Sequence, residues 1–194
     1  MVSAQAPSTY YNSANGLTGQ PLKAALHNII KGHTSITYAQ LWTAFWSTDN
    51  KGNGIVWDMY SDKPNGTPPY VYHLGQDQCG SYSNEGSCYN REHSFPQSWF
   101  NNDGTAKTDL HHIFPTDGYV NGKRSNNAYG EVGSASWTSR NGSKLGTCKT
   151  PGFSGTAFEP IDEYKGDFAR AIMYMSVRYY TEDSNWGSSD TTTK

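Results

Sequence analysis

Apolar residues recur at helical spacing in three segments of the chain, and each segment predicts a helix. The first is residues 20–32, QPLKAALHNIIKG, where a proline stands in the first turn and a glycine follows the last apolar residue. The second is residues 37–46, TYAQLWTAFW, in which Thr37 and Gln40 form a T-x-x-Q capping box. The third, residues 158–180, carries an apolar stripe that we interpret as core packing: Ile161, Tyr164, Phe168, Ile172, Met175 and Tyr179.

Shorter apolar runs lie between these helices and predict strands separated by loops. IVWDMYS and YVYHLG, residues 55–61 and 70–75, are candidate strands bounded by Gly- and Pro-rich turns. TDLHHIFPTD, residues 108–117, predicts a short strand that ends at Pro115. A helix is expected from about Gly118, running through YVNGKRSNNAYG.

The remaining segments complete the prediction of one domain with mixed helices and strands. Residues 131–157 are rich in Gly, Ser and Thr and predict loops with short strands, and the tail SNWGSSDTTTK, residues 184–194, predicts a frayed end. We find no internal repeat and no separate second domain. The length therefore predicts a single α+β domain over residues 1–194.

Composition favours an extracellular protein over a cytoplasmic one. Charged residues make up 16% of the chain, against about 25% in a typical soluble protein. The net charge of −2 argues against a general polyanion binder, although residues 91–149 carry seven basic and five acidic side chains and are the only net basic part. The chain contains no apolar run of about 18 residues, so the sequence predicts no membrane-spanning helix. The first ten residues lack the apolar core of a signal peptide, so a secreted or periplasmic protein would be represented here by a mature or trimmed chain.

Three cysteines raise the question of a disulfide. Cys79 and Cys88 enclose a short Gly/Ser-rich loop that a disulfide could close, and such a bridge would stabilise the fold by roughly 2–3 kcal/mol. The alternative is three reduced, unrelated thiols. Cys148 has no evident partner, and the spacing of the three cysteines fits no zinc site.

The middle of the chain holds side chains suited to phosphate chemistry. In CYNREHSFPQSWF, Glu92 offers a carboxylate oxygen and His93 an imidazole that can act as a base near neutral pH. Downstream, VNGKRSN places Asn121 in a Gly-flanked turn just ahead of two basic residues. Carboxylate and amide oxygens suit Mg²⁺ or Ca²⁺ rather than zinc, and Lys and Arg bind phosphate oxygens. The ordinary alternatives are a surface Glu-His pair and a simple Asn-Gly turn.

Strand geometry sets a condition on this site. Successive side chains of a regular strand point to opposite faces. Glu92 and His93 therefore share a site only where the strand ends or bulges, and the proline at position 96 makes such a break plausible. We expect an irregular backbone at residues 91–94.

Three motifs, taken in order along the chain, resemble the endonuclease I family of secreted and periplasmic bacterial nucleases: NREHSFPQSWF, DLHHIFPTDGYVNGKRSNNAYGEV and FEPIDEYKGDFARAIMYM. The resemblance extends from about residue 70 to residue 180 and implies a mixed α+β fold with a ββα-metal, or His-Me finger, active site. It implies that His93 is the general base and that Glu92 and Asn121 are the two protein ligands of one Mg²⁺, with Mn²⁺ or Ca²⁺ as alternatives. The implied activity is non-specific hydrolysis of DNA, and often of RNA, to 5′-phosphate and 3′-hydroxyl ends. We expect a monomer whose partner is nucleic acid and not a membrane.

Two features depart from that family. The arginine that binds phosphate in some members has no obvious match here, and Arg124, Arg91 and Lys107 are the candidates to replace it. Many members also continue into a tail with an Asn-Arg-Asn-Pro-Phe-like segment, which is not found before Lys194. The domain is therefore expected to lack that tail.

Two other classes of protein fit parts of the sequence. An extracellular carbohydrate-binding module fits the Tyr, Trp, Gly and Asn content, since aromatic rings stack on sugars. A zinc peptidase fits the Glu92-His93 pair together with His111 and His112, but the helical H-E-x-x-H spacing is absent. We expect the two histidines of DLHHI to be structural donors rather than metal ligands.

Overall fold

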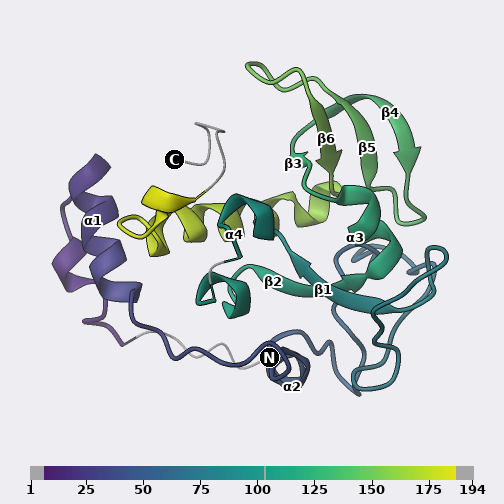
Figure 1. Cartoon of the computed structure of the whole chain (residues 1–194), viewed down its shortest axis with the longest axis horizontal. Helices are drawn as coiled ribbons and strands as arrows, with labels where there is room; N and C mark the ends of the chain where they lie inside the picture. The colour runs from purple at the N-terminus through teal and green to yellow at the C-terminus, as the bar shows by residue number, and fades with distance from the viewer. Residues whose placement is uncertain (1–6, 103, 187–194) are drawn as a thin grey trace.

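The computed structural model describes residues 7–102 and 104–186, so the tail predicted at residues 184–194 falls largely outside the described residues. Figure 1 shows a long helix through the middle of the molecule, with a two-stranded hairpin beside it, a second sheet near one end and the first helix near the other. The architecture is the mixed α+β fold that the sequence predicts, with two separate sheets.

The centre of the fold is two antiparallel strands followed at once by a helix: β1 (Tyr89–His93), β2 (Ile113–Asp117) and α3 (Gly118–Arg124). Tyr89 pairs with Asp117 and His93 pairs with Ile113, in a register without a bulge. The Asp117 carboxylate accepts the backbone N–H of Val120 at 2.8 Å and so caps the first turn of α3. The hairpin and α3 therefore form one continuous ββα unit.

Two details of this unit differ from the sequence prediction. β2 does not end at Pro115 but continues to Asp117, because the sheet has only two strands and a proline is tolerated on a strand with one unpaired edge. α3 begins at Gly118 as predicted but ends at Arg124, since Ser125 adopts a positive φ of 52° that ends the helix.

The second sheet is built from the Gly/Ser/Thr-rich part of the chain, in the order β3-β6-β5-β4. Its strands are β3 (Ala128–Tyr129), β4 (Val132–Thr138), β5 (Lys144–Cys148) and β6 (Thr156–Glu159). β3 runs parallel to β6, and the other pairs are antiparallel. The predicted loops with short strands in residues 131–157 are thus confirmed.

The other helices follow the apolar periodicity: α1 (Gly19–Ile30), α2 (Leu41–Thr48) and α4 (Asp162–Arg178). Short 3-10 turns lie between the main elements: η1 (Asn12–Ala14), η2 (Gln97–Trp99), η3 (Ala106–Thr108) and η4 (Asp183–Asn185). The predicted capping box precedes α2, because Thr37 N–H donates to Gln40 Oε1 at 2.7 Å and Gln40 N–H donates to Thr37 Oγ1 at 3.2 Å. None of the described helices is both long and apolar enough to cross a membrane.

The strands predicted at residues 55–61 and 70–75 were wrong. These segments make isolated bridges, such as the one between Ile55 and His73, and then leave the extended conformation. The chain turns at Asp58, whose carboxylate accepts the backbone N–H of Tyr60 at 2.8 Å. Apolar residues of the first segment, such as Met59 and Tyr60, are therefore buried although they lie in a turn. The alternation of side chains along a strand does not predict this.

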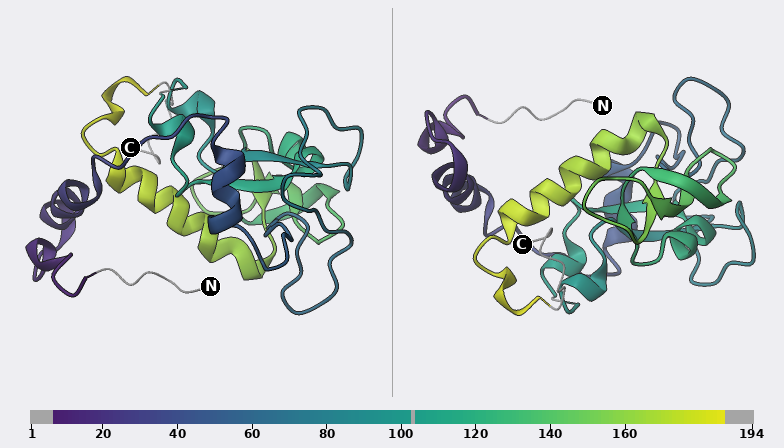
Figure 2. Two further views of the ribbon diagram at one scale, coloured as in Figure 1. Left: turned by 90° about the horizontal axis from the view of Figure 1, so that it is seen from below. Right: turned by 90° about the horizontal axis from the view of Figure 1, so that it is seen from above.

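The stripe on α4 forms core contacts, as its spacing predicts. Phe168 is 1% exposed. Its ring stacks on those of Tyr129 and Tyr60, with centroids 4.7 and 5.5 Å away, and meets Phe114 of β2 edge-on at 5.8 Å. The two views of Figure 2 show that α4 runs from the neighbourhood of α1 to that of the four-stranded sheet. One ring on α4 thus joins the hairpin to the second sheet.

Replacement of Phe168 tests this core. Phe168→Ala is expected to lower the free energy of unfolding by about 3–5 kcal/mol, because it leaves a cavity between three aromatic rings. Met173→Ala on the same helix is the matched control, since Met173 is 61% exposed and its loss should change stability by about 0.5 kcal/mol or less. Urea unfolding of both variants measures the difference, and equal losses would contradict the assignment of the stripe to the core.

Candidate active site

The ββα unit brings the predicted site residues around one small polar cavity. The cavity has a volume of about 160 Å³ and is bordered by Glu92 and His93 from the end of β1 and by Asn121 from α3. Arg91 and Arg124, two of the candidate phosphate-binding residues, also border it. Residues about thirty positions apart in the sequence therefore share one site because α3 follows the hairpin directly.

The backbone at residues 91–93 is regular, which corrects the expected irregularity at 91–94. β1 keeps its pairing through His93 and ends there. Glu92 and His93 consequently have separate sets of neighbours, as alternation along a strand requires. Both still border the cavity, because it lies where the strand ends. No bulge is needed for two successive side chains to reach it.

His93 is held in one orientation by the backbone. Its Nε2 lies 3.0 Å from the carbonyl oxygen of Lys107, which can only accept, so Nε2 carries the proton. Nδ1 is then the acceptor, and the amide of Gln97 donates to it at 3.3 Å. Burial, followed by the neighbouring His112, lowers the pKa of His93 to about 3. The ring is therefore neutral, with its lone pair on Nδ1.

Glu92 is anchored through one of its two carboxylate oxygens. Oε1 accepts hydrogen bonds from Tyr60 Oη at 2.8 Å, Arg124 Nη1 at 2.9 Å and Tyr129 Oη at 3.3 Å. Oε2 accepts none from the described residues. Burial raises the pKa of the Glu92 carboxyl, while the adjacent Arg124 guanidinium acts in the opposite direction. The side chain is fixed at one oxygen and leaves the other available to a ligand.

Arg124 acts as a clamp on the end of β1. It is 1% exposed, and besides Glu92 its guanidinium donates to three backbone carbonyl oxygens: those of His93 at 2.8 Å, Ser94 at 2.6 Å and Asn127 at 3.1 Å. Arg124 thus makes four hydrogen bonds to protein acceptors. A guanidinium has about five N–H donors, so few of them remain for a phosphate. The sequence shows only that Arg124 is a cation near the site, while its contacts favour a positioning role.

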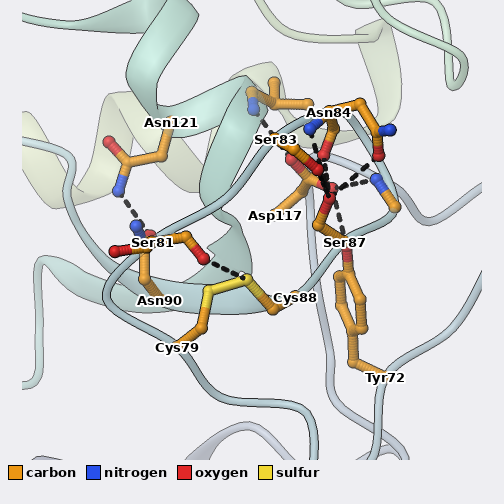
Figure 3. The surroundings of a disulfide bond; sticks show 12 residues. Tyr72, Cys79, Ser81, Ser83, Asn84, Ser87, Cys88, Asn90, Asp117 and Asn121 are labelled. Carbon is orange, nitrogen blue, oxygen red and sulfur yellow. Dashed lines mark hydrogen bonds between the residues drawn. A yellow bond between two sulfur atoms is a disulfide. The ribbon is translucent and has the colours of Figure 1, made fainter.

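Asn121 is also anchored on one side. Its Nδ2 donates to Asn90 Oδ1 at 2.8 Å, and Figure 3 draws this hydrogen bond as a dashed line. Its Oδ1 receives no hydrogen bond from the described residues. Glu92 and Asn121 therefore each present one unused oxygen, and carboxylate and amide oxygens are the donors that Mg²⁺ accepts. The donor set fits a hard divalent ion with few protein ligands.

Arg91 and Lys107 have more unused donor capacity than Arg124. Arg91 makes one hydrogen bond to a described residue, from Nη1 to the carbonyl oxygen of Tyr38 at 2.8 Å. Lys107 Nζ makes no hydrogen bond or ion pair with a described residue and lies 5.2 Å from the centre of the Tyr38 ring. These two cations are the better candidates for contact with phosphate.

A disulfide-closed loop supports α3 from its start. Cys79 and Cys88 form the expected disulfide, and among the described cysteines Cys148 is free and buried. Within the loop, Gly86 N–H donates to Asp117 Oδ2 at 2.7 Å, and Figure 3 shows Asp117 and the bridge in the same region. Asp117 caps the helix that carries Asn121. The bridge therefore steadies the Asn121 side of the cavity.

The two histidines of DLHHI lie outside the cavity lining and have structural contacts. His112 Nε2 donates to the carbonyl oxygen of Ala106 at 2.7 Å, and His111 Nδ1 lies 3.1 Å from Asp109 Oδ1. In residues 7–102 and 104–186, no three His, Cys, Asp or Glu side chains form a group that could hold a metal ion. The zinc-peptidase interpretation thus finds no site in this part of the chain.

Sequence reasoning missed four residues that hold the site: Asn90, Gln97, Tyr60 and Tyr129. Asn90 could have been found, because it lies two positions before Glu92 in the strand and so shares its face. The two tyrosines come from segments far from the motif, and nothing in their local sequence signals the contact.

Comparisons with known proteins agree with the geometry. A sequence model of the endonuclease I family matches residues 18–193. An extracellular ribonuclease of Bacillus amyloliquefaciens is 38% identical over 182 residues, which cover 88% of this chain and 53% of the relative. An extracellular ribonuclease of Bacillus subtilis (strain 168) is 35% identical over 184 residues, which cover 90% of this chain and 55% of the relative. The chain spans about half the length of these curated relatives.

Replacement of Arg124 separates a clamp from a phosphate ligand. Arg124→Met is expected to lower the free energy of unfolding by about 3–5 kcal/mol, because it leaves the buried Glu92 carboxylate without its charged partner. Arg170→Met is the control, since that side chain is 68% exposed on α4. Urea unfolding provides the measurement. An Arg124→Met protein as stable as the wild type would contradict the clamp and favour direct contact with phosphate.

Proposed function

Because the chain belongs to the endonuclease I family, we propose that it is a metal-dependent nuclease that hydrolyses phosphodiester bonds with His93 as the general base. The observation that carries the proposal is the state of His93: a neutral ring, fixed at Nε2 by a backbone carbonyl, beside two anchored ligands with unused oxygens. The family resemblance seen in the sequence motifs is confirmed over most of the chain.

His93 Nδ1 would take the proton from the water that attacks phosphorus. A base must be unprotonated and within hydrogen-bond reach of its water, and the lone pair on Nδ1 meets the first condition. The Lys107 carbonyl oxygen accepts a hydrogen bond from Nε2–H, so the ring needs no tautomer change to act. Gln97, which donates to Nδ1, would release it when the water enters.

Glu92 and Asn121 would hold one Mg²⁺, with Mn²⁺ or Ca²⁺ as the other candidates. When bound, such an ion stabilises negative charge on the phosphate and on the leaving 3′ oxygen. The protein residues would contribute fixed oxygens: Glu92 is set by Arg124 and the two tyrosine hydroxyls, and Asn121 by Asn90. Arg91 and Lys107 would bind phosphate oxygens of the substrate.

The proposed products are 5′-phosphate and 3′-hydroxyl ends, formed without strong sequence preference. Contacts to phosphate carry no base information, so a site built from cations and a metal ion cuts many sequences. Both DNA and RNA are candidate substrates, and the names of the two relatives give RNA particular weight. Secretion is proposed because both relatives are named as extracellular proteins and because disulfides persist in oxidising compartments. We also propose that the protein acts as a monomer.

Replacement of His93 tests the base. His93→Ala is expected to reduce cleavage of supercoiled plasmid and of RNA, each with Mg²⁺, by about 100- to 10,000-fold while the protein stays folded. His73→Ala is the control, because that side chain is 48% exposed and does not border the cavity. Full activity of His93→Ala would contradict the assignment of His93 as the general base. If the wild-type protein digests only one of the two polymers, that polymer is the substrate.

Removal of a ligand tests the metal. Asn121→Ala is expected to weaken Mg²⁺ binding by roughly 10- to 100-fold, measured by calorimetry and as the Mg²⁺ concentration that gives half the maximal rate. Asn28→Ala, an exposed change on α1, should leave both values as in the wild type. EDTA should stop cleavage. Cleavage that persists in excess chelator would argue against any metal mechanism.

A further inference from the structure

We propose that the exposed side of α2, with Trp46 and Trp42, is a stacking track for unpaired nucleotides. We also propose that the preferred substrate is single-stranded nucleic acid. The proposal deepens the nuclease function and rests on it, because it names the strand that enters the same site. The occupant of the track is the substrate strand on its way to or from the cavity.

The outer part of the track is Trp46. Its side chain is 49% exposed, although tryptophan is usually well buried. The indole is held against two glycines, Gly54 and Gly75. A Cβ atom added at either glycine would lie 3.5 Å from the indole ring atoms, which is van der Waals contact. The benzo part of the indole is therefore seated on two glycine turns, and about half of the side chain stays open to solvent. A seated, open ring is a preorganised stacking surface.

Trp42 continues the track toward the cavity. It lies four residues before Trp46 on α2, which places both side chains on the same side of the helix and about 6 Å apart along its axis. Trp42 is half-buried and meets the Tyr89 ring of β1 edge-on at 5.6 Å. α2 is thereby joined to the strand that ends in the site residues.

Arg91 links this helix to the cavity. Its guanidinium carbon lies 4.3 Å from the centre of the Trp42 ring and 3.6 Å from that of Tyr38, while the same residue borders the cavity beside His93. Tyr38 in turn stacks with His93 at a centroid distance of 6.1 Å and has Lys107 Nζ on its ring. Aromatic rings and cations thus succeed one another from His93 to Trp46.

This succession fits a single strand better than a duplex. A duplex keeps its bases stacked inside, whereas an unpaired strand offers the face of each base to an aromatic side chain. Cations that track the backbone and rings that accept any base are together the features of sequence-tolerant single-strand binding. The net charge of −2 does not oppose this, because the cations that matter are local.

Equilibrium binding tests the track without depending on catalysis. The probe is a fluorescent single-stranded oligothymidylate of about 12 nucleotides with a phosphorothioate backbone, which resists hydrolysis, compared with a hairpin duplex of the same chemistry. Fluorescence anisotropy in the absence of divalent ions gives the two dissociation constants. The variants are Trp46→Leu, which keeps an apolar cover on the glycine turns, and Trp46→Phe, which keeps a ring. Phe153→Leu, another exposed aromatic position at 41%, is the control.

Trp46→Leu is expected to weaken single-strand binding roughly ten-fold, with Trp46→Phe recovering most of the loss and the duplex unaffected. Phe153→Leu should bind both probes as the wild type does. Unchanged single-strand binding by Trp46→Leu would overturn the proposal, and so would an equal loss for both probes. A protein that binds an oligosaccharide at Trp46 but no oligonucleotide would also overturn it. A protein that binds the strand through Trp46 but does not cleave it would contradict the proposed function alone.

Discussion

The buried ion pair between Arg124 and Glu92 is the interaction on which the site depends. Both side chains are almost fully buried, at 1% and 2% exposed, and removing two charges from water costs several kcal/mol per ion. The cost is offset because Glu92 Oε1 also accepts from two tyrosine hydroxyls, and because Arg124 also donates to the carbonyl oxygens of His93 and Ser94. One guanidinium therefore fixes both the Glu92 carboxylate and the backbone at His93.

Three side chains around the cavity are each anchored at one atom; Glu92 and Asn121 keep an oxygen that accepts no hydrogen bond from the described residues, while His93 Nδ1 accepts the amide of Gln97. Glu92 is held at Oε1, Asn121 at Nδ2 and His93 at Nε2, and in each case the partner comes from the protein rather than from solvent. Such anchoring removes rotamer freedom before any ligand arrives, so less order has to be created on binding. The site is preorganised by hydrogen bonds that do not themselves touch a substrate.

Much of this could be predicted from the sequence, because helical periodicity and motif order are local properties. Residues a few positions apart along the chain determine three features: the α4 stripe, the capping box of α2 and the helix start at Gly118. Two kinds of feature could not be predicted. The buried turn at Asp58 depends on a carboxylate that accepts the nearby N–H of Tyr60 and also the N–H of Asp117 from the distant strand β2. The role of Arg124 depends on its burial, which its position near other cations does not reveal.

The two tyrosines on Glu92 have a consequence for how the protein becomes competent. The ββα unit is one short piece of chain, yet Tyr60 precedes it and Tyr129 follows it, and both reach the same carboxylate oxygen. A chain that has folded the hairpin but has not yet docked its flanks leaves Glu92 without two of its three donors. The geometry of the site therefore depends on complete folding, because a chain whose flanking segments have not docked lacks two of the hydrogen bonds that fix Glu92.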